Sequence, residues 1–298
     1  MRPRFTWRLR TRGLELGERT LVMGVLNVTP DSFSDAGRFF HPEQAIAHAL
    51  RMLDEGADII DVGGESTRPG SKAVETGAGQ YTGVPAEDEL RRVMPVIEDI
   101  RRQRPDALLS IDTYKARVAC QAVEAGVEIV NDISALRWDG EMARTVAALG
   151  CGVVLMHMRG RPQEWRSFPP LTDAVALVSR ELLEWSDVAV KAGIARERIV
   201  LDPGFGFGKN FGENYPLLAH FEQLHKFGFP LLAGTSRKSF IGRTLARDGQ
   251  DAPPDKRIHG SLAATIACIL QGCHIVRVHD VKAAAEAARI ADQILAAG

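Results

Sequence analysis

From residue 21 to the end of the chain, eight short apolar runs rich in Val, Ile and Leu alternate with longer amphipathic stretches. This alternation is typical of repeated strand and helix units built around a parallel sheet. The predicted strands occupy residues 21–26, 58–62, 108–111, 128–131, 153–156, 199–201, 231–233 and 275–278. The predicted helices occupy residues 42–55, 86–102, 115–125, 140–149, 172–192, 214–227, 258–271 and 281–297.

Eight strands, each followed by a helix, match the repeat number of a (β/α)8 TIM barrel. The length of 298 residues would allow two domains, but no linker divides the pattern. We therefore predict an α/β fold with a single barrel domain over residues 21–298. Residues 1–20 alternate poorly, and we expect them to form an N-terminal hairpin or cap that closes the bottom of the barrel.

The composition limits the classes of function. Apolar residues make up 45% of the chain, which is enough for a packed core, and the net charge of −1 argues against a general nucleic-acid binder. The four cysteines show no CxxC spacing and lie in apolar runs, as reduced thiols of a cytoplasmic protein do. The sequence shows no membrane segment and no secretion signal.

Polar residues follow almost every predicted strand. In a parallel barrel the carboxyl ends of the strands meet on one face, so these side chains are expected to converge on one site. The set consists of Asn27, the 63–68 stretch, Asp112, Asn131, His157, Asp202, the 236–238 stretch, Arg277 and His279. Each residue alone could be a helix cap, but together they indicate a functional site.

The charges of this set suit a ligand with one anionic end and one end that donates hydrogen bonds. Arginines among Asn, Ser and Thr side chains are suited to phosphate or diphosphate, because a guanidinium binds two oxygens at once and stays charged. A carboxylate can accept two parallel hydrogen bonds from the edge of a planar heterocycle. The strand ends therefore favour a ligand that joins a heterocycle to a phosphate group.

Other motifs carry less information. The 204–209 segment (GFGFGK) has neither the phosphate-loop nor the dinucleotide-binding spacing, and we interpret it as a flexible loop that presents Phe207. The histidines form no HExxH or HxH pair, which argues against a zinc site. For Asp58 and Asp61 we expect structural hydrogen bonds. Residues 71–84 lack any periodicity and are predicted to form a long loop after the second barrel strand.

Six motifs, in order along the chain, resemble those of the dihydropteroate synthases. They are VLNVTPDSFSD at 25–35, GGESTRPG at 63–70, SIDT at 110–113, DPGFGFGK at 202–209, GTSRKS at 234–239 and RVHD at 277–280. The resemblance implies condensation of 6-hydroxymethyl-7,8-dihydropterin diphosphate with 4-aminobenzoate, giving 7,8-dihydropteroate and diphosphate. It also implies Mg²⁺ and a homodimer.

The resemblance also assigns roles to individual residues. It implies pterin binding by Asp112, Asn131, Asp202, Lys238 and Arg277. It implies diphosphate binding by Asn27, Thr67, Arg68, Arg277 and His279, with Asn27 also near the metal. It implies aminobenzoate binding by Pro69, Phe207, Lys238 and Ser239, and catalytic roles for Asp112, Lys238 and Arg277. The loops at 28–40 and 67–86 would close over the site.

Three other functions remain to be weighed. The pterin-binding barrel of a methyltetrahydrofolate methyltransferase would share the Asp and Asn contacts but needs no diphosphate pocket. A non-catalytic pterin carrier would not need intact diphosphate residues. A sugar-phosphate isomerase or aldolase would need a paired acid and base or a Schiff-base lysine, and this set shows neither. The diphosphate cluster favours the synthase over all three.

Overall fold

The computed structural model describes residues 2–29, 42–65 and 83–297. In these segments eight parallel strands form one sheet, in the order β8-β7-β6-β5-β4-β3-β10-β9. The strands are β3 (Leu21–Asn27), β4 (Ile59–Gly63), β5 (Leu108–Asp112), β6 (Ile129–Asp132), β7 (Gly152–Met156), β8 (Ile199–Asp202), β9 (Leu232–Ala233) and β10 (Ile275–Val278). The two edge strands meet through a parallel bridge between Leu201 and Leu231, so the sheet is nearly closed into a barrel.

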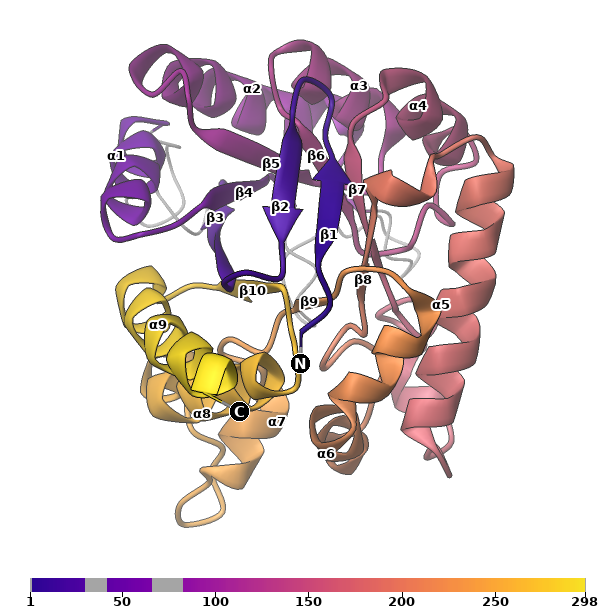
Figure 1. Cartoon of the computed structure of the whole chain (residues 1–298), viewed down its shortest axis with the longest axis vertical. Coiled ribbons are helices and arrows are strands. Elements are labelled where there is room, and N and C mark those ends of the chain that lie inside the picture. Colours follow the sequence, from indigo (N-terminus) through magenta and orange to yellow (C-terminus); the bar gives the residue numbers. More distant parts are fainter. Residues whose placement is uncertain (1, 30–41, 66–82, 298) are drawn as a thin grey trace, which may run out of the picture.

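Helices surround this sheet on the outside (Figure 1). They are α1 (Pro42–Asp54), α2 (Ala86–Gln103), α3 (Ala116–Glu124), α4 (Met142–Leu149), α5 (Ala174–Lys191), α6 (Phe211–Ala219), α7 (Ser239–Thr244), α8 (Ile258–Leu270) and α9 (Val281–Ala297). Short 3-10 segments are η1 (Trp165–Ser167), η2 (Arg196–Arg198), η3 (Phe221–Phe227) and η4 (Pro254–Lys256). The predicted barrel is confirmed, and all eight strand predictions agree with the observed strands to within one residue at either end.

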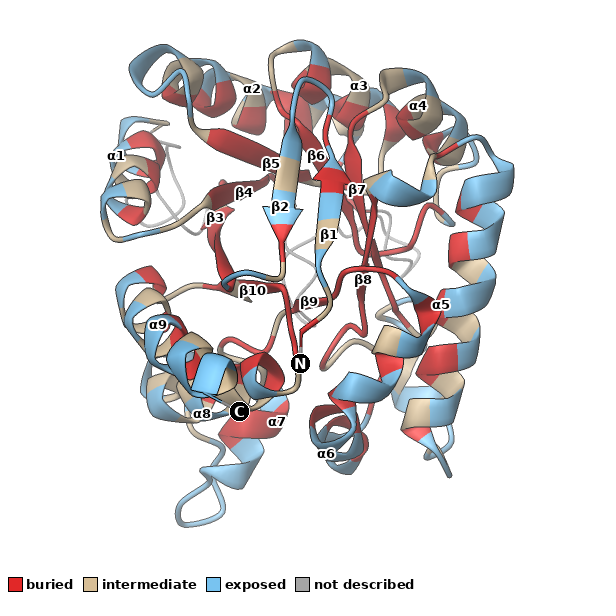
Figure 2. Ribbon diagram, viewed as in Figure 1, coloured by how far each residue is buried: buried red, intermediate tan, exposed pale blue. Residues whose placement is uncertain are grey.

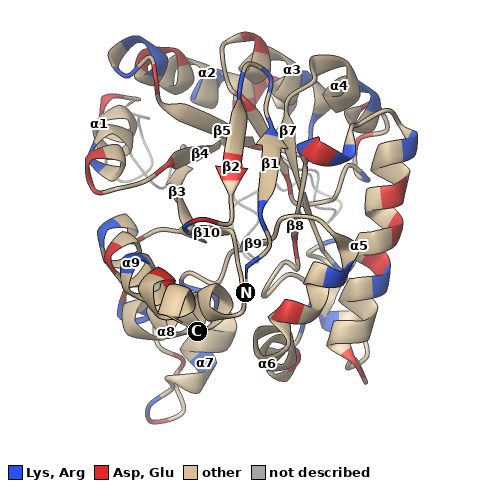
Figure 3. Ribbon diagram, in the orientation of Figure 1, with Lys and Arg blue, Asp and Glu red and all other residues tan. Residues whose placement is uncertain are grey.

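The predicted N-terminal hairpin is also present. Strands β1 (Phe5–Arg8) and β2 (Gly13–Leu16) pair antiparallel and lie across one end of the barrel (Figure 1). Trp7, Leu9 and Leu16 are buried there against the apolar layer at the bottom of the barrel interior. The barrel strands are buried, whereas the helices expose their outer faces (Figure 2). Acidic and basic residues are interspersed along α5 (Figure 3).

Two helix predictions differ from the structure. The stretch predicted as one helix over 214–227 consists of α6, which begins at Phe211, and the separate 3-10 segment η3. The earlier start follows from a capping box, in which the Asn210 backbone N–H donates to Glu213 Oε2 at 2.7 Å. Helix α7 was not predicted, because six residues are too few to show a helical period. Among the described residues, no helix is long and apolar enough to span a membrane.

Candidate active site

The polar site arises from the two-residue period of the barrel strands. Side chains two positions apart on a strand point to the same face of the sheet. Each apolar residue that points into the bottom of the barrel is therefore followed, two positions later, by a residue that points into the upper half. Five strands place a polar side chain there: Ile59 is followed by Asp61, Leu108 by Ser110, Ile129 by Asn131, Val200 by Asp202 and Ile275 by Arg277. The bottom of the barrel is therefore an apolar support, and the upper half is polar.

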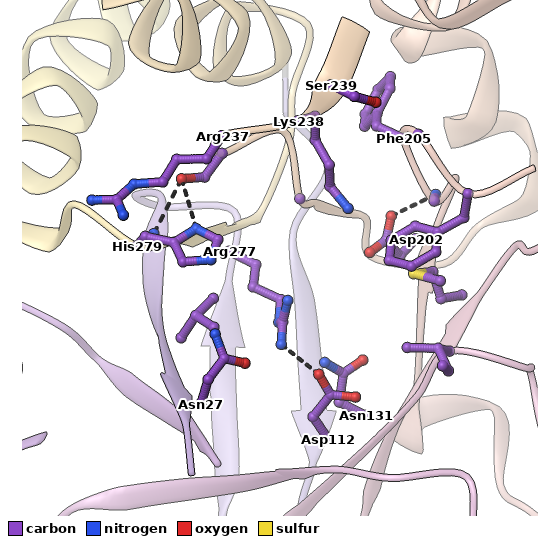
Figure 4. Close-up of a pocket in the computed structure, with 18 of the residues that line it drawn as sticks. Asn27, Asp112, Asn131, Asp202, Phe205, Arg237, Lys238, Ser239, Arg277 and His279 are labelled. Atoms are coloured by element: carbon purple, nitrogen blue, oxygen red, sulfur yellow. Dashed lines mark hydrogen bonds and ion pairs between the residues drawn. The ribbon is translucent and has the colours of Figure 1, made fainter. Parts of the chain in front are cut away.

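The upper half encloses a cavity of about 250 Å³ at the carboxyl ends of the strands (Figure 4). The predicted residues that line it are Asn27, Asp112, Asn131, Asp202, Phe207, Lys238, Ser239, Arg277 and His279. They come from strands β3, β5, β6, β8 and β10, from the segments after β8, β9 and β10, and from the first residue of α7. Thr67, Arg68 and Pro69 lie outside the described residues, as do most of the loop predicted at 71–84 and nearly all of the loop at 28–40.

Arg277 is held between two carboxylates at the floor of the cavity. Its Nε donates to Asp61 Oδ2 and its Nη2 donates to Asp112 Oδ2, both at 2.6 Å. The Asn131 side-chain amide donates to the same Asp61 oxygen at 2.9 Å. Asp61 thus fixes two predicted site residues at once, and its other carboxylate oxygen is buried without a hydrogen-bond partner among the residues that the structure describes.

The contacts of Asp61 extend the interpretation made from the sequence. A structural hydrogen bond was expected for both Asp58 and Asp61, and Asp58 does accept one from the Val22 backbone N–H at 2.8 Å. Asp61 instead holds Arg277 and Asn131 from behind, at 1% exposure. The signal that could have found it is its position two residues after Ile59, on the inward face of β4.

Burial shifts the proton affinities of these groups. Burial raises the pKa of Asp112 to about 7, helped by the nearby Asp61 and opposed by Arg277. Burial disfavours the charge of Arg277, but Asp61 and Asp112 outweigh this effect and raise its pKa. Burial also raises the pKa of Asp202, although the Gly204 N–H opposes this by donating to its Oδ1 at 2.7 Å. The site therefore holds carboxyl groups whose charge depends on what binds beside them.

The opposite wall combines a lysine with aromatic rings. Lys238 extends toward Asp202 across the upper cavity (Figure 4). The Lys238 Nζ lies 3.8 Å from the centre of the Phe207 ring, a cation-π contact. Trp165 also lines the cavity and packs edge-on against Phe207, with ring centres 6.0 Å apart. A flat ligand could lie here between an apolar ring and a positive charge.

A third region surrounds His279 at the end of β10. The His279 Nδ1 lies 3.0 Å from Ser236 Oγ, which also accepts from the His279 backbone N–H at 3.2 Å. Asn27 lies near this group in the cavity (Figure 4). Arg237 lines the cavity as well, but its guanidinium is paired with Asp280 at 2.6 Å. Ser236 therefore positions His279, a role that the sequence alone did not assign to it.

His157 does not join this site, although it follows β7. Met156 takes the inward position and lines the cavity, so His157 faces outward. Its Nε2 lies 3.0 Å from Glu181 Oε2, and its ring stacks on Trp185 with centres 5.0 Å apart. Burial lowers its pKa to about 3. The expectation that every polar strand end converges on the site was wrong here, because a one-residue step reverses the direction of a strand side chain.

The comparisons with known proteins agree with this geometry. Residues 23–279 match the model of the pterin binding enzyme family. The dihydropteroate synthase of Escherichia coli is 45% identical, with 93% of this chain and 92% of the relative covered. The Xanthomonas albilineans dihydropteroate synthase structure with 4-aminobenzoic acid has a TM-score of 0.85 and 44% identity, covering 98% of this chain and 99% of the other.

A second Xanthomonas albilineans structure, in complex with 7,8-dihydropteroate, has a TM-score of 0.82 and 41% identity, covering 99% of both chains. The matches extend over almost the whole barrel, including every strand that contributes to the cavity. They agree with the resemblance carried by the six sequence motifs. The chain belongs to the dihydropteroate synthase family of pterin-binding enzymes.

Proposed function

We propose that this chain condenses 6-hydroxymethyl-7,8-dihydropterin diphosphate with 4-aminobenzoate, releasing 7,8-dihydropteroate and diphosphate. The observation that carries the proposal is the convergence of a carboxylate-lined floor, a His279 region and a Phe207 wall on one cavity. A heterocycle, an anionic leaving group and a small aromatic amine each need one of these surfaces. Family membership supplies the reaction that joins all three.

The pterin ring fits the floor of the cavity. Asp202 would accept the adjacent N–H donors of the ring edge, and Asn131 and Asp112 would bind the other edge. Lys238 would donate to the ring carbonyl, and the guanidinium of Arg277 would lie against the ring face. Support comes from the ion pairs that hold Arg277 at 2.6 Å from both Asp61 and Asp112, which leave its plane little freedom.

The diphosphate fits the region of Asn27 and His279, together with Thr67 and Arg68 from outside the described residues. Mg²⁺ prefers oxygen ligands and retains several waters, so one amide oxygen such as that of Asn27 is a suitable protein ligand. The described residues contain no cluster of three acidic, His or Cys side chains that could hold a metal. We propose that Asn27 would hold Mg²⁺ together with the oxygens of the diphosphate, and that the bound metal would supply charge neutralisation there.

Aminobenzoate fits the remaining wall, beside Phe207, Lys238 and Ser239, with Pro69 from outside the described residues. The ring would stack near Phe207, and its carboxylate would find donors at Ser239 and the start of α7. The half-buried Phe207 closes this wall next to the Lys238 amine. The amine of the substrate would then point toward the pterin methylene carbon.

The chemistry needs electrostatics and positioning rather than a protein nucleophile. The C–O bond to the diphosphate breaks first, with the electron pair leaving on oxygen, and the pterin methylene becomes a resonance-stabilised cation. Arg277 and His279 stabilise the departing charge. Asp112, as a carboxylate beside the ring, stabilises the positive charge that develops there. The amine of aminobenzoate then attacks the methylene carbon, forming the C–N bond, and the resulting ammonium group loses its proton to water.

The test is turnover of the purified protein. With pterin diphosphate, aminobenzoate and Mg²⁺, the chain should form dihydropteroate and diphosphate in equal amounts, whereas omitting any substrate should stop both. Methyl transfer from methyltetrahydrofolate, or pterin binding with no turnover, would instead support the methyltransferase or carrier function. Chelation of Mg²⁺ should abolish tight binding of free diphosphate if the metal enters as proposed.

We also propose that the protein is a homodimer in the cytoplasm. An apolar groove of about 490 Å³ runs between α6, α7 and α8, floored by small residues of α8 such as Ala263 and Ala267. Tyr215, Leu245 and Leu270 are each about two-fifths exposed on these helices. A second copy of this chain would cover this face and bury the exposed side chains. The four cysteines are free thiols, as expected in a reducing compartment.

A further inference from the structure

Lys209 is a buried lysine next to the active site whose amine donates hydrogen bonds to backbone carbonyls. We propose that Lys209 is a positioning residue that holds the Phe207 ring in the wall of the aminobenzoate site. The proposal deepens the proposed function and rests on it. It assigns a role to a side chain that does not line the cavity itself.

The amine of Lys209 binds three carbonyl oxygens. Its Nζ donates to Gly204 at 2.8 Å, to Phe207 at 3.3 Å and to His157 at 3.4 Å. An ammonium group has three N–H donors, so these three acceptors satisfy it. Within the described part of the chain, no carboxylate lies within ion-pair distance of Lys209, which is only 7% exposed. Burial lowers its pKa to about 7.

The loop after β8 is shaped to present these carbonyls. Gly204, Gly206 and Gly208 all have positive φ, a conformation that glycine adopts without strain. A Cβ on Gly204 would lie 1.9 Å from the His157 carbonyl oxygen, and a Cβ on Gly208 would lie 2.4 Å from that of Arg159. The loop therefore packs directly on the segment after β7, and Lys209 bridges the two segments.

A second buried side chain, Asn214, also binds the backbone of this loop. Asn214 accepts from the Gly206 backbone N–H at 2.7 Å and donates to the Asn210 carbonyl at 2.8 Å. Together, Lys209 and Asn214 bind the backbone on both sides of Phe207. A buried amine without an ion-pair partner costs stability, and here its hydrogen bonds hold a loop that contributes a ring to the site.

The position of Phe207 decides the shape of the aminobenzoate wall. Its ring contacts Lys238 and Trp165, both of which line the cavity. Lys209 binds the backbone carbonyl of that same residue. Loss of the three hydrogen bonds would free the loop, and the Phe207 ring would move relative to Lys238. The floor residues Asn131 and Arg277 lie on strands and would keep their contacts.

The experiment compares the Michaelis constants of both substrates. Lys209→Met keeps the length of the side chain and removes its donors, and Lys191→Met on the exposed face of α5 is the matched control. We expect Lys209→Met to raise the KM for aminobenzoate by roughly tenfold or more, because small misplacements of a binding group are costly. The KM for pterin diphosphate should change by less than about threefold, and Lys191→Met should change neither.

A double-mutant cycle separates positioning from general destabilisation. Phe207→Leu alone should also raise the KM for aminobenzoate, and adding Lys209→Met should raise it little further, because both changes remove the same ring contact. Multiplicative effects, or parallel rises in both KM values, would overturn the proposal. A wild-type protein without turnover would reject the proposed function instead.

A binding measurement keeps the proposal testable if Lys209→Met does not fold. Lys209→Gln retains an N–H donor on a shorter side chain and is the milder variant. Trp165 fluorescence, assigned by its loss in Trp165→Phe, reports the ring packing beside Phe207. Lys209→Gln should shift this emission and weaken aminobenzoate binding in the presence of pterin and diphosphate. An unchanged emission with unchanged aminobenzoate affinity would refute the role of Lys209.

Discussion

At the residue scale, three aspartates have different roles in the site: Asp61 and Asp202 are buried, and Asp112 is partly exposed. Asp61 lies behind the cavity and fixes Arg277 and Asn131, whereas Asp112 and Asp202 line the cavity itself. Buried carboxylates are costly unless they are paired or hydrogen-bonded. Asp112 already has an ion pair with Arg277. A ligand that donates hydrogen bonds would therefore stabilise the Asp202 carboxylate more than that of Asp112.

The first prediction concerns Asp202. Asp202→Asn should weaken pterin binding by about 3 kcal/mol, because the amide replaces a charged double acceptor with one acceptor and one donor that faces ring N–H groups. Calorimetry with a pterin that lacks the diphosphate measures this loss directly. Binding of free diphosphate should stay nearly normal in the same variant. Wild-type pterin affinity in Asp202→Asn would contradict the placement of the ring edge.

The second prediction concerns stability and pH. The pKa of Asp112 rises from 3.8 to about 7 on folding, so the folded protein holds this proton more tightly than the unfolded chain does. The resulting penalty is absent below about pH 4, grows as the pH rises and is complete above about pH 7. Asp112→Asn should therefore raise the unfolding free energy at pH 8 by an amount on the order of a few kcal/mol, with little gain at pH 4.

Thermal or denaturant unfolding at several pH values measures this effect. Turnover should fall in the same variant, because the carboxylate that stabilises the pterin cation is gone. A stability gain of equal size at pH 4 and pH 8 would show that the charge of Asp112 is not the cause.

The third prediction tests whether His279 binds the diphosphate leaving group rather than the pterin ring. His279→Ala should weaken binding of free diphosphate and lower turnover by roughly tenfold or more, because a donor to the departing charge is lost. Binding of a pterin without the diphosphate should change much less. Ser236→Ala, which removes the side chain that positions His279, should show a smaller loss of the same kind. Equal weakening of both ligands would place His279 beside the ring instead.

At the scale of elements, the residues that stabilise the barrel and the residues of the site lie at opposite ends of the barrel. The lower interior layer and the β1–β2 hairpin are apolar, and the polar residues of the site lie above them. The same two-residue strand period builds both layers, with apolar side chains at the lower inward positions and polar side chains at the upper ones. The hairpin adds Trp7, which is fully buried and whose indole N–H donates to the Arg198 carbonyl at 2.8 Å.

The fourth prediction follows from this separation. Trp7→Ala should lower the free energy of unfolding by about 3–5 kcal/mol, the usual cost of emptying a buried aromatic site. Both KM values should stay within about twofold of wild type, because the hairpin lies at the opposite end of the barrel from the cavity. Thr6→Ala on the exposed face of the same strand is the control and should change stability little. A large change in KM for Trp7→Ala would contradict this separation.

At the scale of the whole molecule, helices α6, α7 and α8 form one outer face with an apolar groove. Helix α6 follows the loop that carries Phe207 and α7 begins directly after Lys238, so an interface on this face would lie close to the site. Another exposed apolar pair, Ile290 and Ile294, lies on α9, away from this groove's lining. The two faces therefore provide a matched comparison.

The fifth prediction uses that comparison. Leu245→Asp introduces a charge at the groove face and should shift the protein from dimer to monomer in sedimentation velocity at micromolar concentration. Ile290→Asp introduces the same charge at a more exposed position on α9 and should leave the dimer intact. A monomeric wild-type protein, or dissociation caused only by Ile290→Asp, would contradict the proposed interface.

Much of this protein could be predicted from local sequence patterns. The apolar runs predicted every barrel strand, because a parallel strand buried on both faces must be apolar along most of its length. The polar residues that end the runs predicted most of the cavity lining, since parallel strands bring their carboxyl ends to one face. These features depend on spacing along the chain, which the sequence contains completely.

Only the tertiary structure decided which polar residues act together and how. Asn131 lies on strand β6 and points into the cavity. His157 comes directly after strand β7 but faces α5, because neighbouring residues of a strand point to opposite faces. Asp61 and Lys209 act through partners on other strands and loops, at sequence distances that no local pattern covers. Such contacts depend on the closure of the barrel, so the sequence determined the list of candidates and the fold determined their roles.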